Sequence, residues 1–490
     1  MSSQPAAPAI VWFRLDLRLA DNPALYAAAA GGRAVVPVYI WSPAEEKPWH
    51  PGAASRWWLH HSLTELHDDL AEHGSRLVLR SGDALEVLRE IIRTTGAKTV
   101  FWNRRYEPAI RRRDDEIEES LALDGIEVRT FNSALLIEPD QVATKQKKPY
   151  QVFTPFWKAS SAIVDAADDA SQDVVERPRT LRPPTTWPKS ESLKSWQLVS
   201  TIPWAGEFPS WAVPGEAAAR KCLKRFIGKG AVLEYSSERD RPDHDGVSGL
   251  SVHLHFGEIG PRQVRESLRL FAHSGGSTAK VAAEQFLRQL YWREFAHHLL
   301  YHFPSTTDEP LRPEYAKFEW KTDRKKLQAW QRGLTGYPIV DAGMRQLWRL
   351  GWMHNRVRMI VGSFLVKDLL ISWHEGAKWF WDTLVDADLP NNTLGWQWVG
   401  GCGADAAPYF RVFNPTSQAE KFDPAGDYVR RYVPELAKLP AAWIHRPAEA
   451  PHEVLAKAGV VLGKTYPKPL VDHAEARDGA LAAWRAIRNK

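Results

Sequence analysis

The sequence predicts an α/β domain followed by a mostly α-helical domain. Over roughly the first third, short apolar runs that suit buried strands alternate with stretches that suit helices. This alternation is typical of a doubly wound parallel sheet of the Rossmann-like kind. From Pro214 onward the apolar spacing is helical almost to the end. The length of 490 residues exceeds what one hydrophobic core usually serves, which favours two domains.

The elements of the first third follow one another regularly. Asp21 or Asn22 can cap the first helix, because Pro23 suits the first helical position. The expected strands are 9–13, 35–40, 76–80, 99–102 and 127–131, and the expected helices are 24–30, 56–73, 85–94 and 111–123. Ligands of such sheets bind beyond the carboxyl ends of the strands. No G-x-G-x-x-G follows any of these strands and no P-loop motif is present, so neither type of phosphate site is predicted.

The predicted domain boundaries lie where the pattern weakens. Residues 1–140 form the predicted α/β domain. Between 141 and 213, the run RPRTLRPPTTWP and scattered Lys and Ser predict a long surface connection. Residues 214–490 form the predicted helical domain, with strong helix candidates at 282–303 and 351–370.

Composition predicts a soluble protein of the cytoplasm. Hydrophobic content of 44% and charged content of 25% are ordinary for a globular protein. Cys222 and Cys402 are too few for a disulfide framework, which favours a reducing compartment. The N-terminal residues lack a basic start followed by an apolar run, so no signal peptide is expected. No apolar stretch is long enough to cross a membrane.

The charge and the aromatic content favour a polyanionic or planar partner. A net charge of +5 with a pI near 9.0 permits a polyanion without requiring one. The 23 Trp residues exceed what core packing requires, because Leu fills space without an N–H group to satisfy. The functional interpretations are stacking on nucleobases, stacking on a flavin-like ring, and conducting electrons.

The stretch from Asp386 to Pro415, DADLPNNTLGWQWVGGCGADAAPYFRVFNP, combines acids, amides, indoles and glycines. The glycines and Thr393-Leu394-Gly395 predict a segment too irregular for one long helix, and Pro408 limits any helix after it. A permissive backbone beside planar side chains suits a flat ligand. A glycine-rich loop that joins core helices is an equally good interpretation.

The helix candidate at 282–303 brings Gln289, Trp292 and Arg293 onto one face. An ordinary amphipathic helix explains these residues as well. His298 and His302 have the helical spacing of metal ligands, but no acid or thiolate completes the set, so no metal site is predicted.

The second helix candidate and a nearby loop carry further polar groups. On 351–370, Asn355, Arg358, Met359 and Gly362 share a face, and Gly362 allows another surface to approach closely. Helix–helix packing across Gly362 explains that residue equally well. The loop 246–257, GVSGLSVHLHFG, offers hydroxyls and backbone N–H groups that suit a diphosphate.

Taken together, these motifs resemble the photolyase/cryptochrome flavoproteins. The matching segments are GYPIVDAGM (336–344), GWMHNR (351–356), DAD (386–388), GWQW (395–398) and YFRVFNP (409–415). RLDLRLADNPAL near the N-terminus is similar to the family's opening strand and helix. The match covers nearly the whole chain and is closest to class I-type cyclobutane pyrimidine dimer photolyases. It implies a Rossmann-like antenna domain joined to a helical domain that holds a U-shaped FAD.

The resemblance implies roles for individual residues toward FAD. It pairs Arg358 with Asp386, sets Asp386 and Asp388 at the flavin edge, and has Asn392 face flavin N5. The other residues that it assigns to FAD are Tyr235, Ser248, Gly249, Leu250, Ser251, Arg293, Trp352, Asn355 and Ala387. It also assigns to an electron relay between the surface and the flavin the residues Trp396, Trp373 and Trp320.

A further set of residues matches the family's substrate site. Trp292 and Trp398 would wall the lesion pocket, with Asn355, Met359 and Gln289 beside the pyrimidines. The residues assigned to the DNA strand are Arg239, Arg356, Arg411 and Gln418. Gln289 stands where dimer-repairing members typically carry Glu, so a charge-assisted hydrogen bond is replaced by a weaker one from an amide.

The implied function is light-driven repair of cyclobutane pyrimidine dimers in UV-damaged DNA by electron transfer from photoexcited reduced FAD. Photolyases flip their target out of the duplex. A cryptochrome photoreceptor that binds FAD without repair is the alternative that Gln289 favours. A (6-4) photolyase is less favoured, because His354 matches only the first of its two histidines and Asn355 follows the dimer-repair pattern.

The remaining expectations concern partners. A second antenna chromophore (folate, deazaflavin or flavin) stays open, because Ala109 and Ile110 replace polar residues that hold folate in some members. We expect UV-damaged DNA as the macromolecular partner, no membrane, no obligate protein partner, and a monomer.

Overall fold

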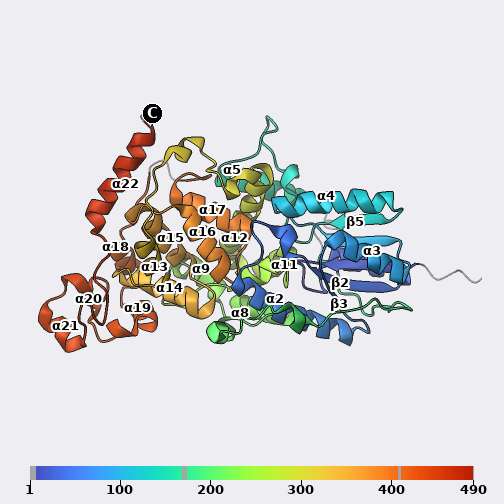
Figure 1. Ribbon diagram of the computed structural model, residues 1–490, viewed down its shortest axis with the longest axis horizontal. Helices are drawn as coiled ribbons and strands as arrows, with labels where there is room; N and C mark the ends of the chain where they lie inside the picture. The colour runs from blue at the N-terminus through green and yellow to red at the C-terminus, as the bar shows by residue number, and fades with distance from the viewer. Residues whose placement is uncertain (1–6, 168–173, 407–409, 489–490) are drawn as a thin grey trace, which may run out of the picture. The chain divides into compact units, whose positions relative to one another are not determined.

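The computed structural model describes residues 7–167, 174–406 and 410–488, and the chain divides into two compact units (Figure 1). Unit 1 comprises Met1–Pro203, Ala212–Leu233 and Ser248–Pro304, and unit 2 comprises Trp204–Trp211, Glu234–Val247 and Ser305–Lys490. This division differs from the predicted domains, because residues 248–304 belong with the sheet-containing unit.

Unit 1 is built on a five-stranded parallel sheet. The strands are β1 (Ala9–Phe13), β2 (Val35–Trp41), β3 (Val78–Ser81), β4 (Thr99–Asn103) and β5 (Glu127–Phe131). Their order in the sheet is β3-β2-β1-β4-β5, and every neighbouring pair is parallel. The predicted doubly wound sheet is therefore confirmed, with the strand order reversing direction at β1.

The helices between these strands begin and end close to the expected residues. They are α1 (Pro23–Ala29), α2 (Ala53–Glu72), α3 (Ala84–Thr95) and α4 (Pro108–Leu123). Asn22 caps α1, because its Oδ1 accepts from the Leu25 N–H at 3.1 Å. Figure 1 shows α3 and α4 alongside the sheet, where Leu88 and Ile91 of α3 and Ile117 of α4 join the core formed by alternate strand residues.

The carboxyl ends of β1 and β4 meet a network of the chain's own polar groups. The side-chain amide of Asn103 donates to Asp16 Oδ2 at 2.5 Å and to Asn22 Oδ1 at 2.8 Å. The buried Arg14 guanidinium donates to Asp114 and to the Asn103 carbonyl. The edge at which such sheets usually bind ligands is thus occupied by internal ion pairs and hydrogen bonds.

One helix of unit 1 lies where the sequence predicted a surface connection. Helix α5 (Phe153–Ala166) buries Phe153, Phe156, Ser160 and Val164 at helical spacing. It packs against α12 (Gly276–His302), which confirms the predicted helix at 282–303 and starts earlier. The other α-helices among the described residues of this unit are α8 (Glu216–Gly228), α10 (Ser251–His255) and α11 (Pro261–Ser274).

Unit 2 is helical. Its helices are α7 (Phe208–Trp211), α13 (Arg324–Gln331), α14 (Pro338–Leu350), α15 (Asn355–Ser363), α16 (Trp373–Thr383), α17 (Leu389–Gly400), α18 (Pro415–Phe422), α19 (Asp427–Tyr432), α20 (Ala441–Ile444), α21 (His452–Ala458) and α22 (His473–Arg488). Helix α9 (Ala231–Glu238) contains residues of both units. Among the residues described, no helix combines the length and the apolarity that a membrane span requires.

The helix expected at 351–370 is divided in the structure. Gly351 ends α14 in the left-handed conformation at φ 63°. His354 then caps α15, because its Nδ1 accepts from the Arg356 N–H at 3.2 Å. After Ser363 the chain widens into a π-helical turn, Phe364–Asp368.

The expectation of an irregular segment after Asp386 is wrong over its first half. Helix α17 runs from Leu389 to Gly400 without a break. Asp388 caps it by accepting from the Asn391 N–H at 3.1 Å, and one internal glycine costs a helix only about 1 kcal/mol. Irregular chain begins at Gly401, with φ 81°. Pro408 and Tyr409 lie outside the described residues.

Candidate active site

The predicted ion pair between Arg358 and Asp386 is present in unit 2. Arg358 Nη2 donates to Asp386 Oδ1 at 3.0 Å and to Oδ2 at 2.8 Å, while its Nε donates to the Met353 carbonyl at 2.8 Å. The Asp386 side chain is only 3% exposed. One guanidinium nitrogen leaves lone pairs on both carboxylate oxygens, so Asp386 can also accept from an N–H group of a ligand. These residues fit the role toward a flavin ring.

The start of α17 fixes two further residues of the predicted flavin set. Asp388 accepts from both the backbone and the side-chain amide of Asn391, the latter at 2.6 Å. Asn392 Nδ2 donates to the Ala377 carbonyl of α16 at 3.1 Å, which fixes the orientation of its amide. Ala387 is buried between the two acids. The DAD and α17 segments thus form one hydrogen-bonded corner.

The three predicted relay residues all belong to unit 2. Trp396 of α17 and Trp373 of α16 are each 3% exposed, whereas Trp320 is partly exposed. The Trp396 ring meets Phe380 at 4.9 Å and Trp330 at 6.3 Å between ring centroids, in both cases nearly edge-on. Gly376 of α16 lies directly against this indole, where even a methyl group would collide with it. Trp396 is therefore held rigidly.

On α12, the three predicted residues Gln289, Trp292 and Arg293 are all partly exposed. Trp292 stacks face to face on Phe153 of α5, with 3.7 Å between ring centroids and 7° between planes. Arg293 Nη1 donates to the Ala134 carbonyl at 2.6 Å. The structure therefore fixes Trp292 and Arg293 by contacts that the sequence did not reveal.

The next residue of α12, Glu294, is buried. Its Oε2 accepts from the Leu136 N–H at 3.0 Å and the Ile137 N–H at 3.4 Å. Burial raises the pKa of the Glu294 carboxyl to about 8. At neutral pH this residue is mostly protonated, so it ties α12 to the loop after β5 without a full buried charge.

The predicted phosphate loop is held by backbone hydrogen bonds in unit 1. Cys222 Sγ donates to the Ser248 carbonyl at 2.9 Å, and Ser248 Oγ accepts from the Leu250 N–H at 3.3 Å. Gly249 takes the left-handed conformation at φ 70°. Leu250 is buried and Ser251 is exposed at the start of α10. Ser251 therefore has the more accessible hydroxyl of the two serines.

Two of the predicted DNA contacts flank one acid in unit 2. Arg356 Nη2 donates to Asp240 Oδ2 at 2.7 Å, and Arg239 Nε lies 3.8 Å from Asp240 Oδ1. The Arg239 guanidinium also lies 5.6 Å from the ring centroid of Tyr235, which is 8% exposed. Asp240 holds both cations in place and competes with a phosphate for them. Asp240 is not among the site residues that the sequence predicted.

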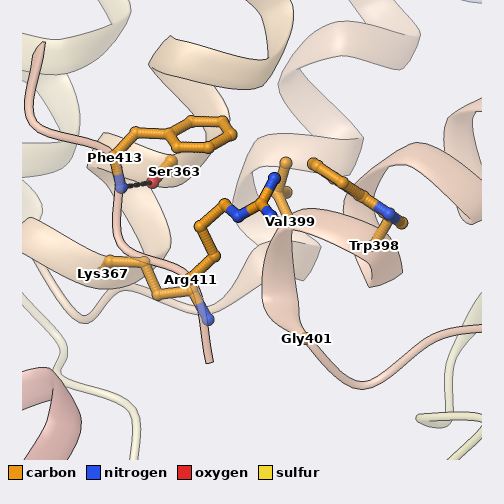
Figure 2. A pocket seen from close by; sticks show the side chains of 7 residues that line it. All are labelled: Ser363, Lys367, Trp398, Val399, Gly401, Arg411 and Phe413. Atoms are coloured by element: carbon orange, nitrogen blue, oxygen red, sulfur yellow. Dashed lines mark hydrogen bonds between the residues drawn. The ribbon is translucent and has the colours of Figure 1, made fainter. Parts of the chain in front are cut away.

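Other predicted substrate residues lie on α15 and α18 and beside a small pocket. Asn355 is exposed, and Met359 and Gln418 are partly exposed. Trp352 stacks on Trp211 at 4.8 Å. Figure 2 shows the small pocket lined by Trp398, Val399, Gly401, Arg411, Phe413, Ser363 and Lys367, with the Arg411 guanidinium beside Val399. An indole and an exposed cation therefore line the same hollow.

His354, which matches the first of the two histidines of (6-4) photolyases, is a buried and neutral ring in the structure. It is 2% exposed, and burial lowers its pKa to about 4. Because Nδ1 accepts from the Arg356 N–H, the proton of the neutral ring is on Nε2. Within the described chain Nε2 has no hydrogen-bond partner.

The histidine pair of α12 is structural. His298 Nε2 accepts from the Tyr150 N–H at 3.0 Å, so its Nδ1–H donates to the Pro139 carbonyl at 3.2 Å. The His302 ring also contacts the Pro139 carbonyl. The described residues contain no group of three or more side chains that could hold a metal ion.

The chain is similar to known proteins over nearly its whole length. Residues 286–486 match the family model described as the FAD binding domain of DNA photolyase, and residues 9–176 match the model described as DNA photolyase. A deoxyribodipyrimidine photo-lyase of Agrobacterium fabrum is 50% identical over 99% of both chains. Cryptochrome-1 of Arabidopsis thaliana is 39% identical over 96% of this chain and 69% of its own length.

Two solved structures have the same fold. A bacterial class III photolyase from Agrobacterium tumefaciens superposes with a TM-score of 0.94 at 50% identity and covers 100% of this chain and 99% of its own. A Synechocystis cryptochrome superposes with a TM-score of 0.88 at 27% identity, covering 98% and 100%. A parallel α/β sheet combined with a helical FAD-binding domain defines a flavoprotein of the light-responsive class. The chain belongs to the DNA photolyase family, which confirms the resemblance seen in the sequence.

Proposed function

We propose that this protein is a deoxyribodipyrimidine photo-lyase, which uses light to split cyclobutane pyrimidine dimers in DNA. The observation that carries the proposal is the 50% identity with a deoxyribodipyrimidine photo-lyase over 99% of both chains. Some of the candidate residues support it, because contacts within the protein fix the side chains of Arg358, Asp386 and Asn392.

FAD, when bound and reduced, would supply on light excitation the electron that opens the dimer's cyclobutane ring, and the electron would return to the flavin from the separated pyrimidines. The chain's own part is to bind and orient. The Arg358–Asp386 pair offers carboxylate oxygens to flavin N–H groups, and Asn392 offers an amide that α16 holds in place. The remaining FAD residues of the proposal are Tyr235, Ser248, Gly249, Leu250, Ser251, Arg293, Trp352, Asn355, Ala387 and Asp388.

Trp396, Trp373 and Trp320 form the proposed route by which electrons reach the flavin. The rigid packing of Trp396 supports this, because a ring that does not move has a constant distance to its neighbours. The partial exposure of Trp320 suits the outer end of the route, since an oxidised indole there can release a proton to water and meet an external reductant.

The proposed lesion pocket has Trp292 and Trp398 as walls and Asn355, Gln289 and Met359 beside the pyrimidines. Indole walls favour a stacked dimer and exclude water. The amides donate to carbonyl oxygens that gain negative charge during ring opening. Arg239, Arg356, Arg411 and Gln418 contact the DNA backbone in this proposal, which therefore includes a dependence of affinity on salt.

The alternative is a cryptochrome that binds FAD without repairing DNA. Gln289 favours it, as does the 39% identity with Arabidopsis cryptochrome-1. A (6-4) photolyase is less favoured, because Asn355 follows the dimer-repair pattern. Within the family, the motif match favours class I-type members, whereas the class III structure at 50% identity favours class III.

The remaining proposals concern the antenna and the state of the protein. A second chromophore, a folate, deazaflavin or flavin, is supported by a Sulfolobus tokodaii photolyase at 29% identity that is described with two FAD molecules and a novel light-harvesting cofactor. An absorption spectrum of the purified protein separates these chromophores. We retain a cytoplasmic monomer as the proposed state, testable by light scattering.

The deciding experiment measures dimer loss. The purified, reduced protein is mixed with an oligonucleotide containing one thymine dimer, illuminated with blue light, and analysed by chromatography against a dark control. We expect the dimer to convert to two thymines only in the light. A yellow protein that leaves the dimer intact favours the cryptochrome alternative. Repair of a (6-4) photoproduct in a parallel reaction favours the assignment as a (6-4) photolyase.

A further inference from the structure

We propose that Phe153 of α5 is a positioning residue for Trp292, holding the indole in the plane that a stacked pyrimidine dimer requires. The inference rests on the proposed function, because Trp292 is a wall of the lesion pocket only in that function. Phe153 itself lies in the stretch that the sequence predicted to be a surface connection.

The contact is a close parallel stack inside unit 1. The ring centroids of Phe153 and Trp292 lie 3.7 Å apart with planes 7° from parallel, and Phe153 is 1% exposed. Phe295 closes the cluster, with its ring edge-on to Phe153 at 5.9 Å and to Trp292 at 5.9 Å. One face of Trp292 is therefore covered by Phe153, and because Trp292 is still partly exposed, the proposal assigns the opposite face to the ligand.

Helix α5 is pinned to α12 immediately before Phe153. His298 of α12 accepts from the Tyr150 N–H at 3.0 Å and donates to the Pro139 carbonyl. Phe156, one turn further along α5, packs against the His298 ring at 5.0 Å and against Phe295 at 5.1 Å. These contacts with α12 therefore fix the position of α5, the helix that begins at Phe153.

Phe153 has a further ring and a cation as neighbours. Trp157 lies parallel to it, with 6.5 Å between centroids and 4° between planes. The Arg288 guanidinium lies 5.4 Å from the Phe153 centroid and 4.7 Å from that of Trp157. Phe153 is enclosed by rings and a cation, so it forms a fixed backing for Trp292.

A fixed backing matters because a Trp side chain rotates about two bonds, and stacking on a planar substrate requires one orientation. When the protein's own packing fixes that orientation, the entropy loss occurs on folding and not on binding. Phe153 therefore contributes to dimer affinity through Trp292, without touching DNA in this arrangement.

The test compares Phe153→Leu with Phe156→Leu. Both residues are buried in the same helix at 1% exposure, but the ring contacts of Phe156 are with Phe295, His298 and Tyr150. We measure the dissociation constants of flavin-loaded protein for a thymine-dimer oligonucleotide and for its undamaged counterpart. In Phe153→Leu we expect about tenfold weaker binding of the dimer. The dissociation constants of both variants for undamaged DNA should stay within about twofold of the wild-type value. The same holds for the dissociation constant of Phe156→Leu for dimer DNA.

Equal losses in the two variants, or an unchanged affinity in Phe153→Leu, overturn the inference. A second measurement separates it from the proposed function. In protein labelled with 5-fluorotryptophan, the Trp292 fluorine signal is assigned by its absence in Trp292→Phe. The ring current of Phe153 should displace this signal in wild type and in Phe156→Leu but not in Phe153→Leu.

A fluorine signal that does not respond to Phe153→Leu overturns the positioning role even if the protein repairs dimers. Conversely, the fluorine signal could respond as expected while the wild-type protein shows neither preference for dimer DNA nor repair. That result would confirm the stacking of Phe153 on Trp292 and reject the proposed function.

Discussion

Two aromatic groups in this molecule are packed in opposite ways. The stacked cluster, Trp292, Phe153 and Trp157, has its rings parallel within 7°, and its tryptophans are partly exposed. The edge-packed cluster, Trp396, Phe380 and Trp330, surrounds the Trp396 indole with rings at 71° and 72°, and all three residues are buried.

The difference separates two uses of the same side chain. A parallel backing covers one face of an indole and leaves the other for a planar ligand. Edge-on neighbours on several sides leave no face free and fix the ring in three dimensions. The first arrangement suits recognition and the second suits electron transfer over constant distances.

The largest expected effect is in the edge-packed cluster. Trp396→Phe should slow thiol-dependent photoreduction of the flavin about a hundredfold, because losing the first relay ring adds about 2.7 kcal/mol or more to the barrier. The measurement is the flavin absorbance under blue light.

Trp330→Phe is the matched control for Trp396→Phe. Trp330 is fully buried, and its indole N–H donates to the Val361 carbonyl at 3.0 Å, so it has no solvent contact through which to release a proton. We expect the rate of flavin photoreduction in Trp330→Phe to stay near that of the wild-type protein. Trp320→Phe should leave flavin bound and slow photoreduction, less than Trp396→Phe does. If Trp330→Phe slows the reaction more than Trp396→Phe, the assignment of roles within this cluster is wrong.

A smaller effect concerns the buried side of α12, the helix that carries Trp292 of the stacked cluster. Burial raises the pKa of Glu294 to about 8 from an ordinary 4.5, so the folded protein binds a proton there that the unfolded chain has lost. Stability contributed by this proton is present below pH 4.5 and is lost as pH rises toward 8. The slope is at most about 1.4 kcal/mol per pH unit.

The window from pH 7 to 8 largely separates Glu294 from two histidines. Burial lowers the pKa of His298 and of His354 to about 4 from an ordinary 6.5, so their opposite contribution grows between these values and is mostly complete by pH 7. Urea unfolding at both ends of this window should show wild type losing stability and Glu294→Gln losing less. Equal losses in the two proteins would show that Glu294 does not titrate there.

The smallest expected effect concerns the contribution of Gln289 to the binding of dimer DNA. Gln289→Glu should strengthen binding of dimer DNA about fivefold, because a carboxylate forms stronger hydrogen bonds to pyrimidine N–H groups than an amide does. Gln285→Glu places the same charge one turn away on an exposed position of α12. This control should bind dimer DNA no better than wild type. A gain in both variants, or in neither, removes Gln289 from the proposed contact with the lesion.

Much of the fold could be predicted because its periodicity is strong. The five strands are short apolar runs with turn residues between them, and each was expected within two residues of its observed start. The Arg358–Asp386 pair came from the resemblance, since the partners are far apart in sequence and no local pattern joins them. The structure supplies the hydrogen bonds that form it.

The residues that escaped prediction owe their roles to tertiary contacts. Helix α5 buries only four residues over its length and follows a Lys-rich run, so its period is weak in the sequence. Helix α17 forms despite its internal Gly395 because Asp388 caps it and its buried side packs on α16. The N–H of His354 is defined by a single backbone hydrogen bond. None of these interactions can be recognised from the residue composition of the neighbouring sequence.

Gly376 has a consequence for how the edge-packed cluster could change. Because α16 lies against the Trp396 indole with no side chain between them, the separation of α16 and α17 is set by backbone and ring alone. A larger residue at 376 would push the two helices apart, which in the proposed relay would lengthen the distance between Trp373 and Trp396 although both tryptophans would still be present. The rate of the proposed electron transfer would therefore depend on the absence of a side chain at residue 376 as well as on the indoles.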